Sequence, residues 1–158
     1  MRYGVPLVGA AAAAAVLAAC GASHRAAEAG PPQDRLIVLG RSIGPISLRD
    51  PRAAVTRTLG PGKRSSRGVV SYFGGRLLVS YWFHDGLTNQ VQYIETAWEG
   101  FHTRSGVEVG TSRQTLHLPR GSCSDRECGL AAGEGPDPPG TFFFLRRGKI
   151  ARIAVSYG

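Results

Sequence analysis

The sequence has 158 residues and a formal net charge of +8. This length suits one domain of ordinary size and is sufficient to bury a sizeable core. A basic balance can indicate a nucleic-acid partner, but an export signal at the N-terminus argues against one, so anionic lipid headgroups or cell-wall polymers are the more economical partners. The alternative is a general compositional bias, because arginine greatly outnumbers lysine, which occurs only at Lys63 and Lys149.

Residues 1–19 have the three parts of an export signal. Arg2 provides a basic start, an apolar run begins at Val5, and small residues precede Cys20. The run is shorter than the roughly 20 apolar residues that a membrane span needs. It therefore predicts a signal peptide over residues 1–19. An ordinary secretory signal that is cut elsewhere, with Cys20 incidental, is the alternative, and a retained transmembrane anchor is a further one.

The end of this run, Leu17-Ala18-Ala19-Cys20, resembles the lipobox of bacterial lipoproteins. The resemblance implies that the sulfur of Cys20 is lipidated, that the chain is cut before Cys20, and that this residue becomes the mature N-terminus. One acyl chain alone gives marginal membrane binding, whereas several give stable attachment. The resemblance therefore implies a palmitate-bearing protein anchored to the cell membrane on its extracytoplasmic side.

Residues 20–35 are predicted to be a flexible tether, because small, polar and proline residues dominate there without apolar periodicity. Order is expected over 36–158, as one α+β domain. A short apolar strand is predicted at 36–39 and a brief extended segment at 46–48. Asp50-Pro51 predicts a capped helix start, and glycine and proline after Leu59 end a helix over 51–59.

Three stretches rich in β-forming residues follow this helix and predict an antiparallel meander. They are residues 68–73, 77–83 and 88–96. Gly74-Gly75 and His84-Asp85-Gly86 supply the turns between them, since these residues tolerate the positive φ that tight hairpins require.

A second copy of the same pattern is predicted in the rest of the chain. Thr111 and Gln114 have capping-box spacing, and a shift of 61 positions overlays the first helix region on this one. The final hairpin overlays at a shift of 62. We therefore expect two tandem repeats of a short helix followed by an antiparallel meander, at about 36–100 and 101–158. The segment 121–140 is expected to replace or distort the first strand of the second meander.

Cys123 and Cys128 remain as a pair once Cys20 carries lipid. In an oxidising compartment they predict a disulfide that contributes about 2 kcal/mol by closing a small loop. A redox-active pair or a metal site is the alternative, but thioredoxin-like C-x-x-C spacing and a second pair of ligands with zinc-like spacing are both absent from the sequence.

The combination of a short strand, a helix ending in Leu-Gly-Pro and a strand-Asp-Gly-strand hairpin resembles the SmpA/OmlA-type envelope lipoproteins. It is also similar to each half of the β-lactamase inhibitor protein family, which stacks two helix-plus-sheet repeats. Both resemblances imply a binding or assembly factor and not an enzyme. The residues that carry them are Ile43-Gly44, Val55, Leu59-Gly60-Pro61, Tyr72, Leu78, Val79, Phe83, Asp85-Gly86 and Ile94.

Catalytic residues are not expected. His84, His102 and His117 share no local motif with a serine or cysteine nucleophile. Carboxylates that pair in space rather than in sequence stay open as an alternative, with Asp85, Glu95, Glu99 and Glu108 as candidates. Each is more simply a solvated turn or strand residue, so we expect no enzyme activity, no cofactor and no metal.

The aromatic residues suggest a binding surface. Tyr81, Trp82 and Tyr93 are the candidate residues, because tyrosine, tryptophan and arginine dominate interface hot spots. Alternation along the strand places Tyr81 on one side and Trp82 on the other. An alternative is that both sides are partly packed, or that Trp82 is an isolated exposed aromatic.

The expected function is therefore a non-catalytic binding role toward an envelope protein or a cell-wall component. An inhibitor of a secreted enzyme is one alternative, and it would use a loop or a sheet face to block an active site. A carrier of a hydrophobic ligand is another, and it would need an apolar pocket between the sheet and the helices.

Overall fold

The computed structural model describes residues 32–66, 68–83 and 88–157. The predicted signal peptide, most of the predicted tether and the lipidation site Cys20 lie outside these ranges, as do His84 and Asp85. Within the described ranges, no helix combines the length and the apolar character that crossing a membrane requires.

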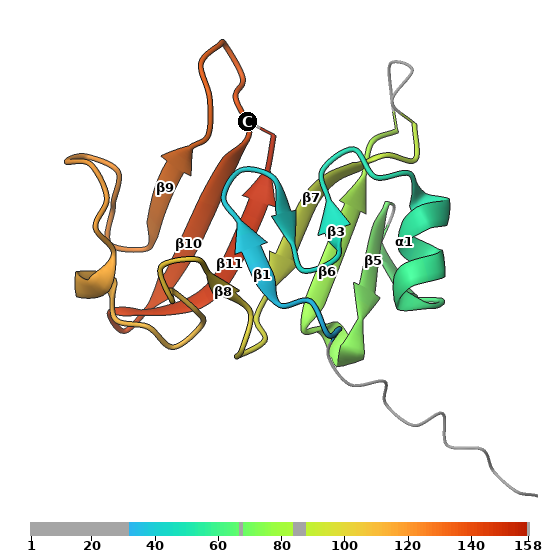
Figure 1. Cartoon of the computed structure of the whole chain (residues 1–158), viewed down its shortest axis with the longest axis horizontal. Helices are drawn as coiled ribbons and strands as arrows, with labels where there is room; N and C mark the ends of the chain where they lie inside the picture. Colours follow the sequence, from blue (N-terminus) through green and yellow to red (C-terminus); the bar gives the residue numbers. More distant parts are fainter. Residues whose placement is uncertain (1–31, 67, 84–87, 158) are drawn as a thin grey trace, which may run out of the picture.

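The main element of the fold is a seven-stranded antiparallel sheet, called here the large sheet (Figure 1). Two three-stranded meanders, β5-β6-β7 and β9-β10-β11, meet where β7 pairs with β11, and β4 extends one edge. In spatial order the strands are β4 (Lys63–Ser66), β5 (Val69–Tyr72), β6 (Leu77–Tyr81), β7 (Val91–Thr96), β11 (Lys149–Ser156), β10 (Gly140–Arg146) and β9 (Glu127–Ala131).

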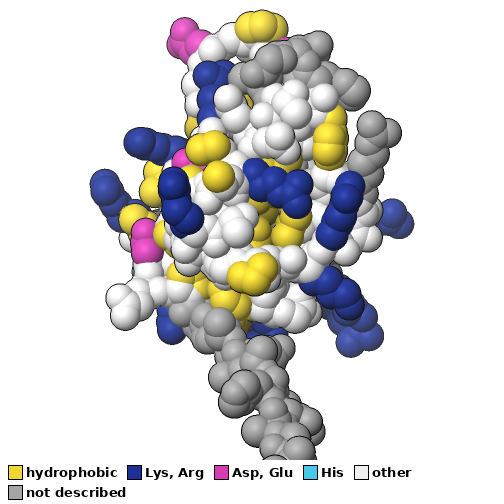
Figure 2. Space-filling model, turned by 90° about the vertical axis from the view of Figure 1, so that its right-hand side faces the viewer, with side chains coloured by type: hydrophobic (Ala, Val, Ile, Leu, Met, Phe, Trp, Pro, Cys, Tyr) yellow, Lys and Arg dark blue, Asp and Glu magenta, His cyan; other side chains and the backbone are white. Residues whose placement is uncertain are grey.

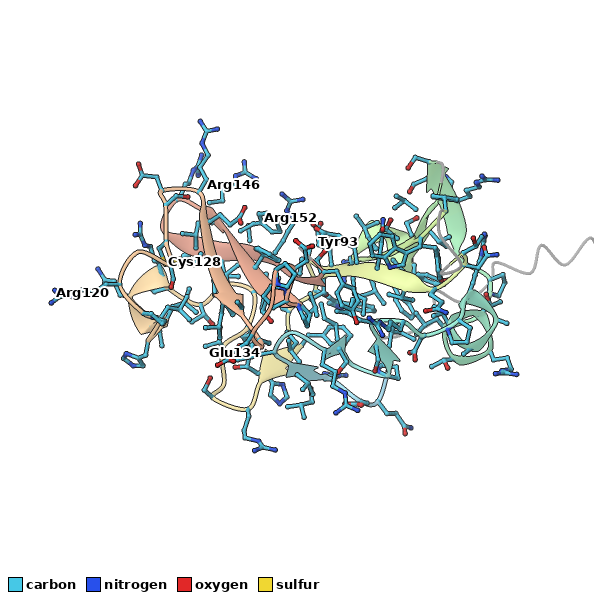
Figure 3. All side chains as sticks on the ribbon, turned by 90° about the horizontal axis from the view of Figure 1, so that it is seen from above. Tyr93, Arg120, Cys128, Glu134, Arg146 and Arg152 are labelled. Carbon is cyan, nitrogen blue, oxygen red and sulfur yellow. A yellow bond between two sulfur atoms is a disulfide. The ribbon has the colours of Figure 1, made fainter. Side chains whose placement is uncertain are left out.

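A second, four-stranded sheet lies over one face of the large sheet (Figures 1 and 3). Its strands in spatial order are β3 (Ile46–Ser47), β2 (Ser42–Ile43), β1 (Leu36–Val38) and β8 (His102–Thr103), and β1 and β8 run parallel. The Gly40 N–H donates a 2.7 Å hydrogen bond to Oγ1 of Thr141, which ties the loop after β1 to the large sheet. We call this sheet the small sheet.

The core lies between the two sheets. Side chains alternate across the strands, so the packed face of the large sheet presents Val79, Ile94 and Val155 in one register row. The small sheet contributes Ile37 and Ile43 to the same buried cluster. These residues are almost fully buried, and hydrophobic burial on this face therefore holds the fold together.

The first helix forms as predicted, from Arg52 to Leu59 (α1), and ends at Gly60 with a φ of 79°. Val55 is its buried residue and packs into the main core. The expected cap is wrong in one respect. Asp50 makes no hydrogen bond to the helix; its Oδ2 instead accepts from the Ser47 N–H at 2.7 Å and stabilises the preceding turn.

The predicted second helix, and with it the pair of tandem helix-plus-meander repeats, is wrong. Only a single 3₁₀ turn forms there, η2 (Arg113–Thr115); the other 3₁₀ turn is η1 (Phe73–Gly75). Leu116 and Leu118 are two positions apart, which suits an extended segment, and Pro119 disfavours a helical conformation at the residue before it. The fold is instead mostly β-structure in two sheets with one short helix.

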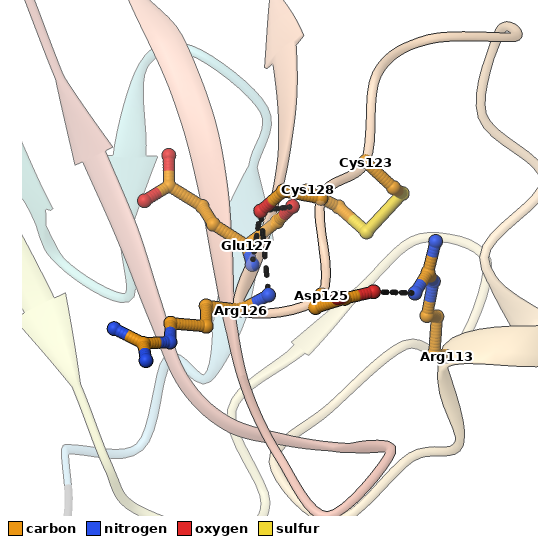
Figure 4. A network of polar contacts seen from close by, with 7 residues as sticks. Arg113, Cys123, Asp125, Arg126, Glu127 and Cys128 are labelled. Carbon is orange, nitrogen blue, oxygen red and sulfur yellow. Dashed lines mark hydrogen bonds and ion pairs between the residues drawn. A yellow bond between two sulfur atoms is a disulfide. The ribbon is translucent and has the colours of Figure 1, made fainter.

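Cys123 and Cys128 form a disulfide, as expected for this pair (Figure 4). The intervening turn is held by Ser124, whose Oγ accepts from the N–H groups of Arg126 and Glu127 at 3.3 and 3.1 Å. Asp125 lies 4.0 Å from Arg113 at an exposed position. Because Cys128 belongs to β9, the disulfide closes a turn against this edge strand, in a segment where the sequence left the strand uncertain.

Candidate functional site on the open face of the large sheet

One face of the large sheet is turned away from the small sheet, and we call it the open face. Figure 3 shows Tyr93 and Arg152 on this side of the sheet, with the small sheet and α1 on the other. Pairing across β6, β7 and β11 places Ser80 beside Tyr93 and Tyr93 beside Ser156. These three side chains are only half-buried, unlike their neighbours on the packed face.

The structure separates the three residues that the sequence proposed as a binding face. A register shift after Ser80 pairs Tyr81 with Val91 and leaves Gln92 unpaired in a bulge. Tyr81 is 1% exposed and lies in the core, so it does not belong to a surface. Trp82 and Tyr93 lie together on the open face and line the same hollow.

This hollow lies on the open face and has a volume of about 490 Å³. The rings of Trp82 and Tyr157 tilt against each other with centroids 6.4 Å apart. Gln92 donates from Nε2 to Oγ of Ser80 at 3.0 Å, so uncharged polar groups stand beside the rings. The full lining is Val69, Ser80, Trp82, Gln92, Tyr93, Ser156 and Tyr157.

A cation adjoins the aromatic rings. The guanidinium carbon of Arg49 lies 5.2 Å from the ring centroid of Tyr157, a cation–π distance. The Arg49 backbone has a φ of 69°, and its N–H donates a 2.8 Å hydrogen bond to the carbonyl of Val91. The turn before α1 therefore carries this arginine to the end of β7, beside the hollow.

A hydrogen-bonded group joins the hollow to the centre of the open face. The Tyr93 hydroxyl donates to Oε2 of Glu95, and Arg152 donates from Nη1 to Oε1 of Glu95 at 3.1 Å. Burial raises the pKa of Tyr93, and its hydrogen bond to Glu95 raises it further, so the phenol stays protonated and keeps donating. The guanidinium of Arg152 also lies 4.8 Å from the Phe144 ring centroid.

The candidate carboxylates do not converge. Glu95 is occupied by Tyr93 and Arg152, whereas Glu99 lines a separate hollow with Arg76 and Trp98. Glu108 stands beside β8, where its N–H donates to Oγ1 of Thr111. In the described part of the chain, no group of three or more His, Cys, Asp or Glu side chains could hold a metal ion.

The histidines also stand apart from the hollow. His102 is exposed on β8, with its Nδ1 3.2 Å from the carbonyl oxygen of Gly100. His117 is exposed after η2.

Positive charge gathers at the end of the molecule formed by α1 and β4. Figure 2 views this end, where Lys and Arg side chains clearly outnumber Asp and Glu. Described residues between positions 51 and 94 include no acidic side chain, and their exposed basic side chains are Arg52, Arg57, Lys63, Arg64 and Arg76. The described residues at this end of the protein therefore carry a surplus of positive charge.

Sequence reasoning missed Arg49, Tyr157 and Arg152. For Arg152, the sequence did offer a signal. Residues two apart on a strand share one side, so Arg152, Ala154 and Ser156 on the last strand belong to a single face. Arg49 had no comparable signal, since a turn residue 108 positions before Tyr157 reaches it only through the fold.

Comparison with protein-family models, with curated proteins and with solved structures finds no match to this chain. The resemblances to lipoprotein families therefore stay predictions that depend on their sequence motifs.

Proposed function

We propose that this protein is a lipid-anchored, extracytoplasmic binding protein whose open sheet face contacts an envelope protein or a cell-wall component. The observation that carries the proposal is the hollow, which Trp82, Tyr93 and Tyr157 line and where Arg49 lies over the Tyr157 ring. Interfaces concentrate their binding energy in such tryptophan, tyrosine and arginine side chains. A rigid seven-stranded sheet backs the hollow, so little order needs to be created on binding.

The anchor in this proposal is Cys20, on the motif Leu17-Ala18-Ala19-Cys20. The anchor places the domain at the membrane surface, where the basic end can meet anionic groups. A carrier of hydrophobic ligands has less support. Val55, Val79 and Tyr81 belong to one buried cluster at the boundary of α1 and the large sheet, and each is at most 1% exposed.

The experiment is a crosslinking pull-down of the full-length protein from its own membrane fraction. We expect a reproducible partner that is lost in the Trp82→Ala variant. Leu36→Ala is the matched control, because Leu36 is an exposed apolar residue of the small sheet and its loss should leave capture unchanged. Equal capture by the wild-type protein and Trp82→Ala would remove the open face from the proposal.

The anchor is tested separately by the intact mass of the same sample. We expect a chain that begins at Cys20 and carries the added mass of acyl chains, and we expect Cys20→Ser to leave the membrane fraction. An unmodified Cys20 would overturn the anchor but would leave the binding test in force.

A further inference from the structure

We propose that the hollow binds a sugar chain that carries an acidic group, of the chemical class of a hexuronic acid. This inference rests on the proposed binding function of the open face and names the chemistry of the partner. It uses three features of the hollow: its aromatic surfaces, its uncharged hydrogen-bonding groups and the neighbouring guanidinium.

The aromatic surfaces suit a pyranose ring. A sugar ring presents C–H groups on its faces and hydroxyl groups around its edge, so it requires an apolar surface with polar groups beside it. Trp82, Tyr93 and Tyr157 supply apolar ring surface with polar tips. A volume of about 490 Å³ falls within the range of small-ligand sites and leaves room for one or two sugar rings.

The polar groups around the rings are uncharged and can both donate and accept. The hydroxyl of Ser80, the amide of Gln92 and the hydroxyl of Ser156 belong to the lining. The indole N–H of Trp82 is enclosed and has no acceptor among the described residues. This buried N–H is closed to solvent, so the contribution of Trp82 to the hollow is its ring surface.

Arg49 supplies the preference for an acidic sugar. In the described part of the chain, its exposed guanidinium is paired with no carboxylate, and it lies over the Tyr157 ring. A guanidinium binds a carboxylate through two parallel hydrogen bonds. A left-handed backbone conformation costs a non-glycine residue about 1–2 kcal/mol. A glycine at position 49 would avoid this backbone cost. The presence of arginine there is therefore better explained by a role of its side chain than by a requirement of the backbone.

The place of the hollow favours a sugar over an extended peptide. A peptide that adds a strand needs a free sheet edge for its backbone hydrogen bonds. The hollow instead draws its lining from β5, β6, β7 and β11, which are internal strands, whereas the edges of the large sheet are β4 and β9. A ligand here therefore contacts side chains on a face and not backbone groups at an edge.

The test is isothermal titration of the full lipidated chain in detergent micelles with a tetrasaccharide of hexuronic acid. A neutral glucose tetrasaccharide of equal length is the matched ligand. We expect binding of the acidic sugar, a loss of about tenfold in affinity with Trp82→Ala, and a loss of about fivefold with Arg49→Gln. Arg49→Gln should abolish the preference for the acidic over the neutral sugar. Arg49→Gly, which suits the left-handed backbone, should do the same in a chain that folds at least as well.

Arg120→Gln is the control for the loss of a positive charge, because Arg120 lies at one end of the molecule, well away from Tyr93 near the centre (Figure 3). Its affinity for the acidic sugar should equal that of the wild-type protein. Binding that is unchanged in Trp82→Ala would overturn the assignment to the hollow. Tighter binding of an octaglutamate peptide than of the acidic sugar would overturn the sugar as the partner.

The inference and the proposed function can fail separately. If neither sugar binds but the pull-down still captures a protein that Trp82→Ala loses, the sugar is wrong and the binding function stands. If neither sugar binds and Trp82→Ala has no effect on capture, both are overturned.

Discussion

The two faces of the large sheet come from the same strands and differ in chemistry. On the packed face, Ile94 and Ile153 are fully buried against the small sheet. One position away on the same strands, Tyr93 and Arg152 face outward and carry a phenol and a guanidinium. Because side chains alternate along a strand, a step of one residue separates the two environments.

This difference assigns stability and recognition to different faces. Hydrophobic burial on the packed face stabilises the domain in proportion to the apolar area removed from water. The open face contributes less burial and is therefore free to carry polar and aromatic groups. Glu95 is a buried polar residue on this face: it is 6% exposed and depends on Tyr93 and Arg152 for its hydrogen bonds.

The largest expected effect comes from the packed face. Ile94→Ala should lower the free energy of unfolding by about 3 kcal/mol, because it removes buried methylene groups and leaves a cavity. Urea denaturation followed by circular dichroism measures this change. Ser80→Ala, on the open face of the neighbouring strand, should change stability by less than about 1 kcal/mol. Equal losses in the two variants would contradict the division between the faces.

The disulfide has the next largest expected effect. Its Cys128 lies in the same register row as Phe143 and Ile153 on the packed face. The double variant Cys123→Ser, Cys128→Ser should lose about 2 kcal/mol, since the unfolded chain regains the freedom of a small loop. Thermal unfolding of the wild-type protein with and without a reductant provides the parallel measurement. A reductant that leaves the melting temperature unchanged would argue against this stabilisation.

A smaller loss is expected at the buried carboxylate of the open face. Glu95→Ala should cost about 1.5 kcal/mol, because the Tyr93 hydroxyl loses its acceptor in a partly enclosed position. Arg152 is half-exposed, so its ion pair with Glu95 adds little. Glu95→Gln keeps an acceptor oxygen and should lose less than Glu95→Ala in the same denaturation assay. Equal losses in the two variants would show that the charge, which both remove, and not hydrogen bonding, dominates at this position.

The smallest effect is a dependence on alkaline pH. Burial raises the pKa of Tyr81 on the packed face and of Tyr93 on the open face above the ordinary value of 10.0, and their hydrogen bonds to Tyr72 and Glu95 add to this. Above pH 10 the unfolded chain releases protons that the folded chain keeps, so the free energy of unfolding should fall as pH rises.

The variants Tyr81→Phe and Tyr93→Phe test this dependence in denaturation series at pH 8, 10 and 11. Each should flatten the fall in stability above pH 10, because each removes one group that titrates differently in the two states. A double variant with the same alkaline slope as the wild-type protein would contradict the assignment.

Local patterns predicted the elements that depend on neighbouring residues. The helix over 51–59, the strands after it and the disulfide were all predictable, because periodicity, turn residues and the spacing of the cysteines are local properties. The second helix was predicted wrongly. The overlay with the first helix favoured a helix there, whereas Pro119 and the two-residue spacing of Leu116 and Leu118 favour an extended segment. The polar strand Lys63–Ser66 carried no apolar signal and forms only by pairing with β5.

By itself, the sequence determined the positions of helix α1 and of strands β5, β6 and β7 after it, and the pairing of Cys123 with Cys128. Only the tertiary structure decided that β7 pairs with β11 and that the small sheet covers one face of the large sheet. It thereby placed Tyr81 inside, and Trp82 with Tyr157 at a shared hollow. The physical reason is that alternation along a strand tells which residues share a side, whereas burial of one side depends on distant segments that pack against it.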